Sequence, residues 1–246
     1  MLKKQNFPIV LFVTASLCVF VLMGIFYIFI SSSKHYLIQP TSEKNERFYL
    51  NENYSNSGDS LITKKPSLKD VLAGPIITSS DPSFGKQDAL ITLVVFSDFE
   101  CSFCHQQEKN LLKLIKEYKD KIQLIWKDYP ENQEDSPSFQ AALAGRCAQA
   151  QGKFWLFHDL AFAANNDSNN QEFFKIASQL DIDAEKFINC LENSLTKELV
   201  LDNITEANAL GINGVPYIYI NDRQVIGETS YEELKRMADE EIEKVK

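Results

Sequence analysis

Two cysteines in the middle of the chain have the types and spacing for redox chemistry. Cys101 and Cys104 are separated by two residues in the segment FSDFECSFCHQQE, residues 96–108. A thiolate attacks disulfides, and two intervening residues allow the partner thiol to close an intramolecular disulfide. The same spacing can also provide half of a tetrahedral zinc site or a purely structural bridge. The pair alone therefore leaves three interpretations open.

The other potential metal ligands favour the redox interpretation. The chain has no second CxxC, and its histidines, His35, His105 and His158, fall in no ligand spacing. A structural zinc site needs four ligands. His105 adjoins Cys104 but would point away from it on a helix. We therefore expect a redox couple, with no metal and no cofactor.

The first thirty residues indicate the compartment, which decides how thiols behave. Residues 9–30 are almost wholly apolar, and no charged residue lies between Lys4 and Lys34. A helix needs about 20 apolar residues to cross a bilayer core, whereas a cleaved signal peptide usually has roughly 7 to 15. The serines at 31–33 leave cleavage open as the alternative. We expect residues 1–8 to be cytoplasmic, residues 9–30 to be a transmembrane anchor of the inner (plasma) membrane, and the rest to lie on the periplasmic or extracytoplasmic side.

The exported part divides into a tether and one domain. Residues 31–70 are polar, rich in Ser, Asn and Lys, and show no sustained period, which is typical of a flexible linker. Residues 71–246 have the length of one domain that can bury a core without metal. The formal net charge of -9 argues against nucleic acid as a partner, because phosphates need a basic face.

Around the cysteine pair the pattern changes from strand to helix. Residues 89–98 have the β-branched density of a buried strand, and Leu111 and Ile115 recur at helical spacing behind Cys104. This pattern places Cys104 on the buried stripe of a helix and Cys101 at its exposed start. A thiol at a helix N-terminus is stabilised as thiolate by the macrodipole and the free N–H groups. We therefore expect Cys101 to be the nucleophile and Cys104 the resolving cysteine.

The remaining pattern predicts an α/β fold that contains an all-helical insertion at about 135–210. A second strand is predicted at 121–130. The first helix of the insertion has Ser136 as its N-cap and Pro137 at its first position, and it closes near Gly152. Further predicted elements are helices at 154–163, 171–180, 184–191 and 196–210, strands at 215–222 and 223–227, and a last helix with Ser230 and Glu233 as its capping box.

A second cysteine pair lies in the predicted insertion. The five cysteines are Cys18, Cys101, Cys104, Cys147 and Cys190. Cys18 lies in the apolar span, so four remain outside, an even number in an oxidising compartment. Cys147 and Cys190 have apolar neighbours on predicted helices. We expect them to form a structural disulfide; the alternative is two separate buried thiols.

Three blocks together resemble a known family. They are VVFSDFECSFC, AGRCAQAQGKFWLFHDLAF and LGINGVPYIYIN, and they occur in this order between roughly residues 70 and 246. In them the chain resembles the DsbA-like branch of the thioredoxin superfamily, which comprises exported or membrane-anchored thiol-disulfide oxidoreductases. The resemblance implies a thioredoxin-like fold with a helical insertion, here preceded by one N-terminal transmembrane helix.

The resemblance also implies roles for two residues far from the cysteines. Pro216 occupies the place of the family's cis-proline opposite the disulfide, with Val215 before it. The backbone of Val215 would then pair with an extended substrate segment as a temporary strand. The alternative is an ordinary trans-proline at the start of an edge strand.

The chain departs from the family pattern at two places. The acid that many members carry six positions before the first cysteine is Val95 here, and the nearest acids are Asp98 and Glu100. Strongly oxidising members have Pro-His between the cysteines, where this chain has Ser102 and Phe103. Ser102 is a candidate hydrogen-bond donor to the thiolate, the Phe103 side chain is not, and Glu100 opposes negative charge. We therefore expect an oxidant that is not an extreme one.

The implied function is the introduction of disulfides into secreted or envelope proteins. A thiolate of a reduced exported substrate would attack the Cys101–Cys104 disulfide, and the substrate's second thiol would resolve the mixed disulfide. The implied reoxidant is a DsbB-type quinone-coupled membrane protein, or a small-molecule oxidant. The alternatives are a disulfide isomerase or reductase, and a non-enzymatic thioredoxin-fold chaperone or metal-handling module.

Overall fold

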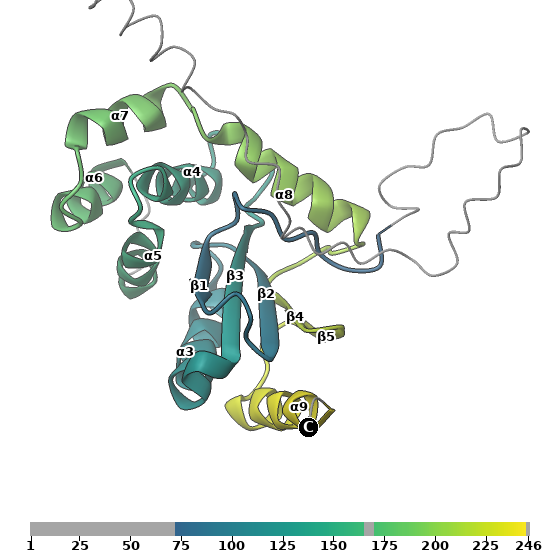
Figure 1. The fold of residues 1–246 in the computed structure, drawn as a ribbon. Coiled ribbons are helices and arrows are strands. Elements are labelled where there is room, and N and C mark those ends of the chain that lie inside the picture. The colour runs from purple at the N-terminus through teal and green to yellow at the C-terminus, as the bar shows by residue number, and fades with distance from the viewer. Residues whose placement is uncertain (1–71, 165–169, 245–246) are drawn as a thin grey trace, which may run out of the picture. The chain divides into compact units, whose positions relative to one another are not determined.

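The structure, a computed structural model, describes residues 72–164 and 170–244 (Figure 1). The expected transmembrane segment at 9–30 and the expected linker at 31–70 lie outside these residues. Within the described part of the chain, no helix combines the length and the hydropathy that crossing a membrane requires.

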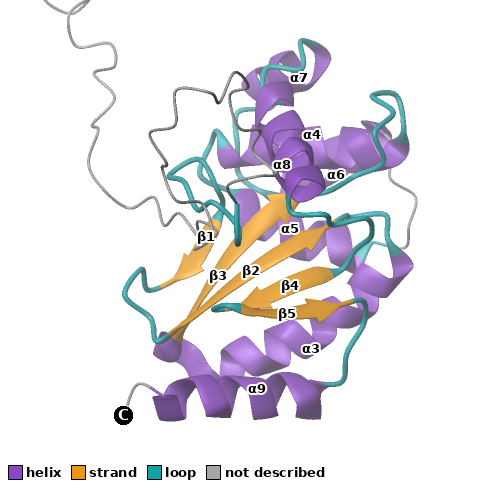
Figure 2. Cartoon of the chain, turned by 90° about the vertical axis from the view of Figure 1, so that its right-hand side faces the viewer, coloured by secondary structure: helices purple, strands orange, loops and turns teal. Residues whose placement is uncertain are grey.

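A five-stranded mixed sheet lies at the centre of the described residues (Figure 2). Its strands are β1 (Ser83–Gly85), β2 (Ile91–Ser97), β3 (Ile122–Asp128), β4 (Tyr217–Ile220) and β5 (Arg223–Ile226), in the order β1-β3-β2-β4-β5. β2 and β3 are parallel, and the other neighbouring pairs are antiparallel. The two parallel strands therefore end at the same edge, where Ser97 lies opposite Asp128.

Helices cover both faces of the sheet. They are α3 (Ser102–Tyr118), α4 (Pro137–Gln149), α5 (Phe154–Ala163), α6 (Asn170–Gln179), α7 (Ala184–Glu192), α8 (Lys197–Ala209) and α9 (Tyr231–Lys244). α3 and α9 pack on one face, as Figure 2 shows, and α8 packs on the other. The block α4 to α8 follows β3 and precedes β4.

The burial of β2 explains this layering. Every residue of the strand is buried, and successive side chains point to opposite faces. Leu93 and Val95 belong to the core that α3 and α9 cover. Val94 and Phe96 belong to the core on the side of α8. A strand that is apolar on both faces needs helices on both, and the chain supplies them.

The predicted α/β fold with a helical insertion is confirmed in the described residues. The predicted N-cap is present, because the Ser136 hydroxyl accepts the N–H of Phe139 at 3.1 Å. The capping box of the last helix is only half formed. Ser230 accepts the N–H of Glu233 at 3.2 Å, but the Glu233 carboxylate pairs with Arg236 instead of returning to Ser230.

One strand was not predicted. β1 has three residues, all exposed, and pairs antiparallel with β3 at the sheet edge. So short and exposed a strand has no alternation of apolar and polar residues to reveal it. Gly85 ends it with a φ of 91°, and a Cβ there would lie 2.3 Å from the carbonyl oxygen of Ile122. Only glycine fits this turn.

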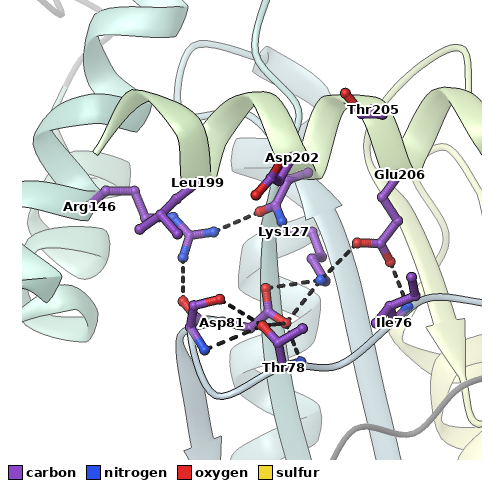
Figure 3. A pocket seen from close by; sticks show the side chains of 11 residues that line it. Ile76, Thr78, Asp81, Lys127, Arg146, Leu199, Asp202, Thr205 and Glu206 are labelled. Carbon is purple, nitrogen blue, oxygen red and sulfur yellow. Dashed lines mark hydrogen bonds and ion pairs between the residues drawn. The ribbon is translucent and has the colours of Figure 1, made fainter. Parts of the chain in front are cut away.

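A buried ammonium group ties the segment before β1 to α8 (Figure 3). Lys127, at the end of β3, has its Nζ 2.9 Å from a carboxylate oxygen of Asp81 and 2.9 Å from one of Glu206. The other oxygen of Glu206 accepts the N–H of Ile76 at 2.6 Å. Because a buried charge is tolerated when it is paired, these contacts hold residues 76–81 in place.

A buried guanidinium group continues this polar cluster. Arg146 of α4 donates to Asp128, and to Asn203 of α8 at 2.7 Å. Arg146 and Asn203, together with Lys127, Asp81 and Glu206, line a cavity of about 240 Å³. The cations of this cavity therefore serve to join β3, α4 and α8.

Candidate active site

The cysteine pair forms the start of α3. Cys101 is the N-cap residue, and its sulfur accepts the N–H of Cys104 at 3.2 Å. Cys101 is partly exposed, whereas Cys104 is 1% exposed. Both are free thiols in the structure. The predicted placement, with one sulfur at the helix start and the other on the buried stripe, is confirmed.

The loop before β4 lies directly beside Cys101. The Val215–Pro216 peptide bond is cis, so the alternative of a trans-proline is wrong. The Cys101 thiol donates a hydrogen bond to the carbonyl oxygen of Val215, with a sulfur–oxygen distance of 3.6 Å. The carbonyl oxygen of Pro216 accepts the N–H of Gly227 at 2.9 Å, which fixes this loop on the end of β5.

The surroundings of Cys101 favour its thiolate. A hydrogen bond from the Cys104 thiol, together with the backbone N–H groups of Cys104 and Phe103, lowers the pKa of Cys101 to about 7. Partial burial and the nearby Asp98 carboxylate oppose this shift. An N-terminal position on a helix is a common cause of such a lowered thiol pKa.

The surroundings of Cys104 favour its thiol. Burial is the main cause that raises the pKa of Cys104 far above its usual value, and the hydrogen bond with Cys101 adds to it. The Ser97 hydroxyl, at the end of β2, hydrogen-bonds to the Cys104 sulfur and partly offsets these effects. The sequence analysis did not identify Ser97, although its place at the end of the strand before the cysteines was visible.

The two acids before the cysteines differ in their environments. Burial raises the pKa of Asp98 to about 6, against hydrogen bonds from the Glu100 N–H and the Ser138 side chain. Glu100 is partly buried, and its Oε1 has no hydrogen-bond partner among the described residues. Val95, at the place of the family's acid, is 2% exposed in the core under α3 and α9. Asp98 is therefore the acid that acts on Cys101.

The dipeptide between the cysteines faces solvent. Ser102 is exposed, and Phe103 is 59% exposed. The hydrogen bonds that lower the pKa of Cys101 come from Cys104 and from backbone N–H groups, and the Ser102 hydroxyl is not among them. Phe103 instead exposes an apolar ring two positions after Cys101.

The second predicted pair is a disulfide. Cys147 of α4 and Cys190 of α7 are bonded with an S–S distance of 2.02 Å and are 43 positions apart. Both belong to the buried core of the helical insertion. The alternative of two separate thiols is therefore wrong. Among residues 72–164 and 170–244, no group of three or more His, Cys, Asp or Glu side chains could hold a metal ion.

A ring from the segment before the cysteines anchors the insertion. Phe99 is 2% exposed and stacks on Trp126 with ring centroids 5.0 Å apart. Gly145 of α4 allows this packing, because a Cβ there would lie 3.2 Å from the Phe99 ring. The insertion therefore packs against residues that precede Cys101 by only two positions. The sequence analysis did not identify this contact.

The chain is similar to known proteins over most of this domain. A family described as Thioredoxin matches residues 78–240, which is more than half of the chain. The "Probable disulfide bond formation protein D" of Bacillus anthracis is 29% identical over 177 residues, covering 68% of this chain and 80% of that protein. The crystal structure of oxidised BdbD from Bacillus subtilis superposes with a TM-score of 0.61 at 22% identity, over 67% of this chain and 94% of that one.

Another group of relatives is much longer than this chain. The "Na(+)/H(+) antiporter NhaA 3" of Salinispora tropica is 27% identical over 160 residues, covering 65% of this chain. The match covers 24% of the antiporter, so the chain spans about a quarter of that protein's length. The family match and the fold agree with the features described above. The chain therefore belongs to the thioredoxin family.

Proposed function

We propose that the protein is a thiol-disulfide oxidoreductase that introduces disulfides into exported proteins through Cys101 and Cys104. The observation that carries this proposal is the asymmetry of the two sulfurs. Cys101 is partly exposed with a pKa of about 7, and Cys104 is buried with a raised pKa. A thiol of low pKa is a good leaving group, which makes a disulfide that contains it an oxidant.

The reaction has two exchanges. A substrate thiolate attacks the Cys101 sulfur, the Cys101–Cys104 bond breaks, and its electron pair goes to the Cys104 sulfur. The substrate's second thiolate then attacks the substrate sulfur of the mixed disulfide, and Cys101 leaves as a thiolate. The substrate dithiol is oxidised to a disulfide, and the enzyme pair is reduced to two thiols. In the reverse reaction, in which the reduced enzyme attacks a disulfide, Cys101 is the nucleophile and Cys104 is the resolving cysteine.

Val215 and Pro216 provide the surface for the substrate backbone. An extended segment that pairs with Val215 would lie beside the Cys101 sulfur, because that sulfur is 3.6 Å from the Val215 carbonyl oxygen. The exposed Phe103 ring supplies an apolar contact next to the same sulfur. Backbone pairing is tolerant of sequence, which suits an enzyme with many protein substrates.

Two features support an extracytoplasmic compartment for the protein. The Cys147–Cys190 disulfide fits an oxidising space. The apolar run at 9–30 fits a single transmembrane anchor, which would hold the domain on the extracytoplasmic side of the plasma membrane through the linker at 31–70. The name of the Bacillus anthracis relative, a probable disulfide bond formation protein, supports the oxidising direction. The reduced enzyme would be reoxidised by a DsbB-type quinone-coupled membrane protein or by a small-molecule oxidant.

Paired assays on the full chain test this proposal. The oxidised protein is given a fully reduced substrate protein and, separately, the same substrate with scrambled disulfides. We expect oxidation of the first and loss of that activity in Cys101→Ser. In Cys104→Ser the Cys101 thiolate should attack a disulfide of the scrambled substrate, and the mixed disulfide should stay trapped because the resolving thiol is gone. Action on the scrambled substrate alone would identify an isomerase. Action on neither would identify a chaperone or metal-handling module and refute the proposal.

A further inference from the structure

Two amide side chains of α3 hold the backbone of one residue in a distant loop. The Oε1 of Gln107 accepts the N–H of Thr229 at 2.7 Å, and the Nδ2 of Asn110 donates to the carbonyl oxygen of Thr229 at 2.9 Å. Residues three apart on a helix are neighbours on its surface, so both side chains can reach the same residue. They occupy both hydrogen-bonding groups of the Thr229 backbone, as a neighbouring strand would. Gln107 and Asn110 together form an amide clamp.

The clamp includes a buried group that lacks a partner. Gln107 is 1% exposed, and its Nε2 has no hydrogen-bond partner in the described part of the chain. A buried amide without a partner destabilises a fold, whereas an apolar side chain of similar size does not. The opposite orientation of the amide would be worse, because its NH₂ group would then face the Thr229 N–H. The hydrogen bond to Thr229 is therefore what a glutamine, and not an apolar residue, contributes at this position.

The clamped loop is attached to the cis-proline. Thr229 lies in the connection between β5 and α9. Two positions before it, the Gly227 N–H donates to the Pro216 carbonyl oxygen at 2.9 Å. On the strand side, Ile226 pairs with Tyr217, the residue after Pro216. The clamp therefore acts two residues away from the N–H that holds Pro216, at the point where β5 has ended.

The helix that carries the clamp also carries the reactive sulfur. Cys101 is the N-cap residue of α3, and both clamp residues lie further along the same helix. The Val215 carbonyl oxygen lies 3.6 Å from the Cys101 sulfur. α3 therefore positions the sulfur directly, and it positions the backbone of Val215 and Pro216 through the clamp and the loop that the clamp holds.

Oxidation removes the direct contact between the sulfur and this backbone. In the Cys101–Cys104 disulfide the Cys101 sulfur carries no hydrogen, so it cannot donate to the Val215 carbonyl oxygen. A substrate strand that pairs with Val215 needs that backbone correctly placed beside the sulfur. The attachment of Pro216 to the clamped loop does not involve the sulfur, so it persists in the oxidised enzyme.

We propose that Gln107 and Asn110 are positioning residues that set the substrate-pairing backbone of Val215 against the Cys101 sulfur. This inference rests on the function proposed above. The clamp acts on substrates that pair through their backbone, namely protein and peptide dithiols. A small dithiol such as dithiothreitol has no backbone to pair, so its reaction with the disulfide does not use the clamp. The two classes of dithiol therefore distinguish a positioning role from a general loss of structure.

The test compares two dithiols as reductants of the oxidised full chain. Single-turnover reduction is followed with dithiothreitol and with an unstructured peptide that contains two cysteines. Gln107→Met keeps the side-chain volume and removes the acceptor, and Asn110→Leu removes the donor at a half-buried position. We expect the rate constant for the peptide to fall about tenfold in Gln107→Met and about fivefold in Asn110→Leu, the range that one lost hydrogen bond gives. The rate constant for dithiothreitol should change by less than about twofold, because its barrier does not include backbone pairing.

Three controls connect the effect to backbone pairing. Gln106→Met replaces an exposed glutamine next to Gln107 and should match the wild type with both dithiols. The same peptide with an N-methylated backbone beside its first cysteine cannot donate these hydrogen bonds, so it should react similarly with the wild type and the clamp variants. In hydrogen-exchange mass spectrometry, the segment that contains Gly227 and Thr229 should exchange faster in both clamp variants and not in Gln106→Met.

The outcomes separate the two proposals. Folded clamp variants that keep the wild-type rate constant for the peptide would overturn the clamp, and so would equal losses with the peptide and with dithiothreitol. If Gln107→Met does not fold, Asn110→Leu decides in the same way, because its position is only half buried. In each of these cases a wild-type chain that oxidises the peptide leaves the proposed function intact. If the wild-type chain exchanges no disulfide with either dithiol, the proposed function itself fails.

Discussion

The sulfur of Cys101 lies 3.6 Å from the carbonyl oxygen of Val215, although 114 positions separate the two residues. The antiparallel pairing of β2 with β4 causes this proximity, since Phe96 lies opposite Tyr217. The end of β2 leads to Cys101, and the start of β4 follows Val215. The whole helical insertion lies between the two strands in sequence, and the pairing of β2 with β4 brings its two ends together.

Cys101 should react with alkylating agents well before Cys104. The pKa of Cys101 is about 7 and that of Cys104 is raised by burial, so near neutral pH only Cys101 has a substantial thiolate fraction. In the reduced protein, iodoacetamide labelling followed by peptide mass spectrometry should give a Cys101 rate with a midpoint near pH 7. Cys101→Ser is the control and should label slowly. Faster labelling of Cys104 in the wild type would reverse the proposed roles.

Asp98→Asn should lower the pKa of Cys101 further. The Asp98 carboxylate raises the pKa of that thiol, and asparagine removes the charge while keeping an oxygen for the Glu100 N–H. Thiolate absorbance at acidic to neutral pH would show the midpoint of Cys101 moving to lower pH. The same change should make the active-site disulfide more oxidising, because a more stable thiolate favours the reduced pair. An unchanged or higher midpoint would contradict the assigned role of Asp98.

The same substitution should stabilise the fold in a pH-dependent way. The pKa of Asp98 is about 6 in the folded protein against 3.8 for a free side chain. The folded state therefore holds this proton more tightly, and the free energy of unfolding falls as the pH rises from about 4 to about 6. Asp98→Asn should recover up to about 3 kcal/mol at pH 7 and little at pH 4. Urea unfolding at the two pH values would measure the difference; equal effects at both would refute burial as the cause.

The sequence predicted the structure best where one periodic pattern of apolar residues determined which side chains are buried. The apolar stripe behind Cys104 correctly separated the buried from the exposed sulfur, and the helix at 154–163 has the predicted bounds. The same stripe contains Glu108, one turn after Cys104. A glutamate on a buried face was thus visible in the sequence, but its partner His158, with Nε2 3.7 Å from the Glu108 carboxylate, belongs to another helix. No local pattern could bring those two together.

The burial of Lys127 could not be predicted from the sequence for the same reason. Lys127 lies within a predicted strand, where a lysine normally marks a solvent-facing or edge position. Its partners Asp81 and Glu206 are 46 and 79 positions away. Only the folded chain shows that all three are buried together, because pairing between distant segments is what makes their burial possible.

Lys127→Met should destabilise the protein strongly. The Lys127 side chain is 2% exposed, and its removal would leave the buried carboxylates of Asp81 and Glu206 without their cation. Breaking a buried ion pair in this way usually costs about 3–5 kcal/mol. Chemical denaturation would measure the loss. The control is Lys186→Met, whose exposed pair with Asp183 should change stability by less than about 0.5 kcal/mol. Similar small effects for both would show that the buried cluster is dispensable.

Removing the second disulfide should affect stability and not chemistry. Cys147 and Cys190 join α4 to α7 across a sequence separation of 43, and the loop-entropy estimate for that length is up to about 4 kcal/mol. The double variant Cys147→Ala, Cys190→Ala should therefore unfold at a lower denaturant concentration. The two cysteines that are replaced lie in the core of the insertion. The Cys101 thiolate is stabilised by different groups, namely the Cys104 thiol and the backbone N–H groups at the start of α3. The rate of dithiothreitol reduction at Cys101 should stay within about twofold of the wild type. The residues around Cys101 do not change, so the activation barrier of the exchange should stay the same. A folded double variant that has lost exchange at Cys101 would show that the insertion's disulfide also positions the active site, through the contact of Gly145 with Phe99.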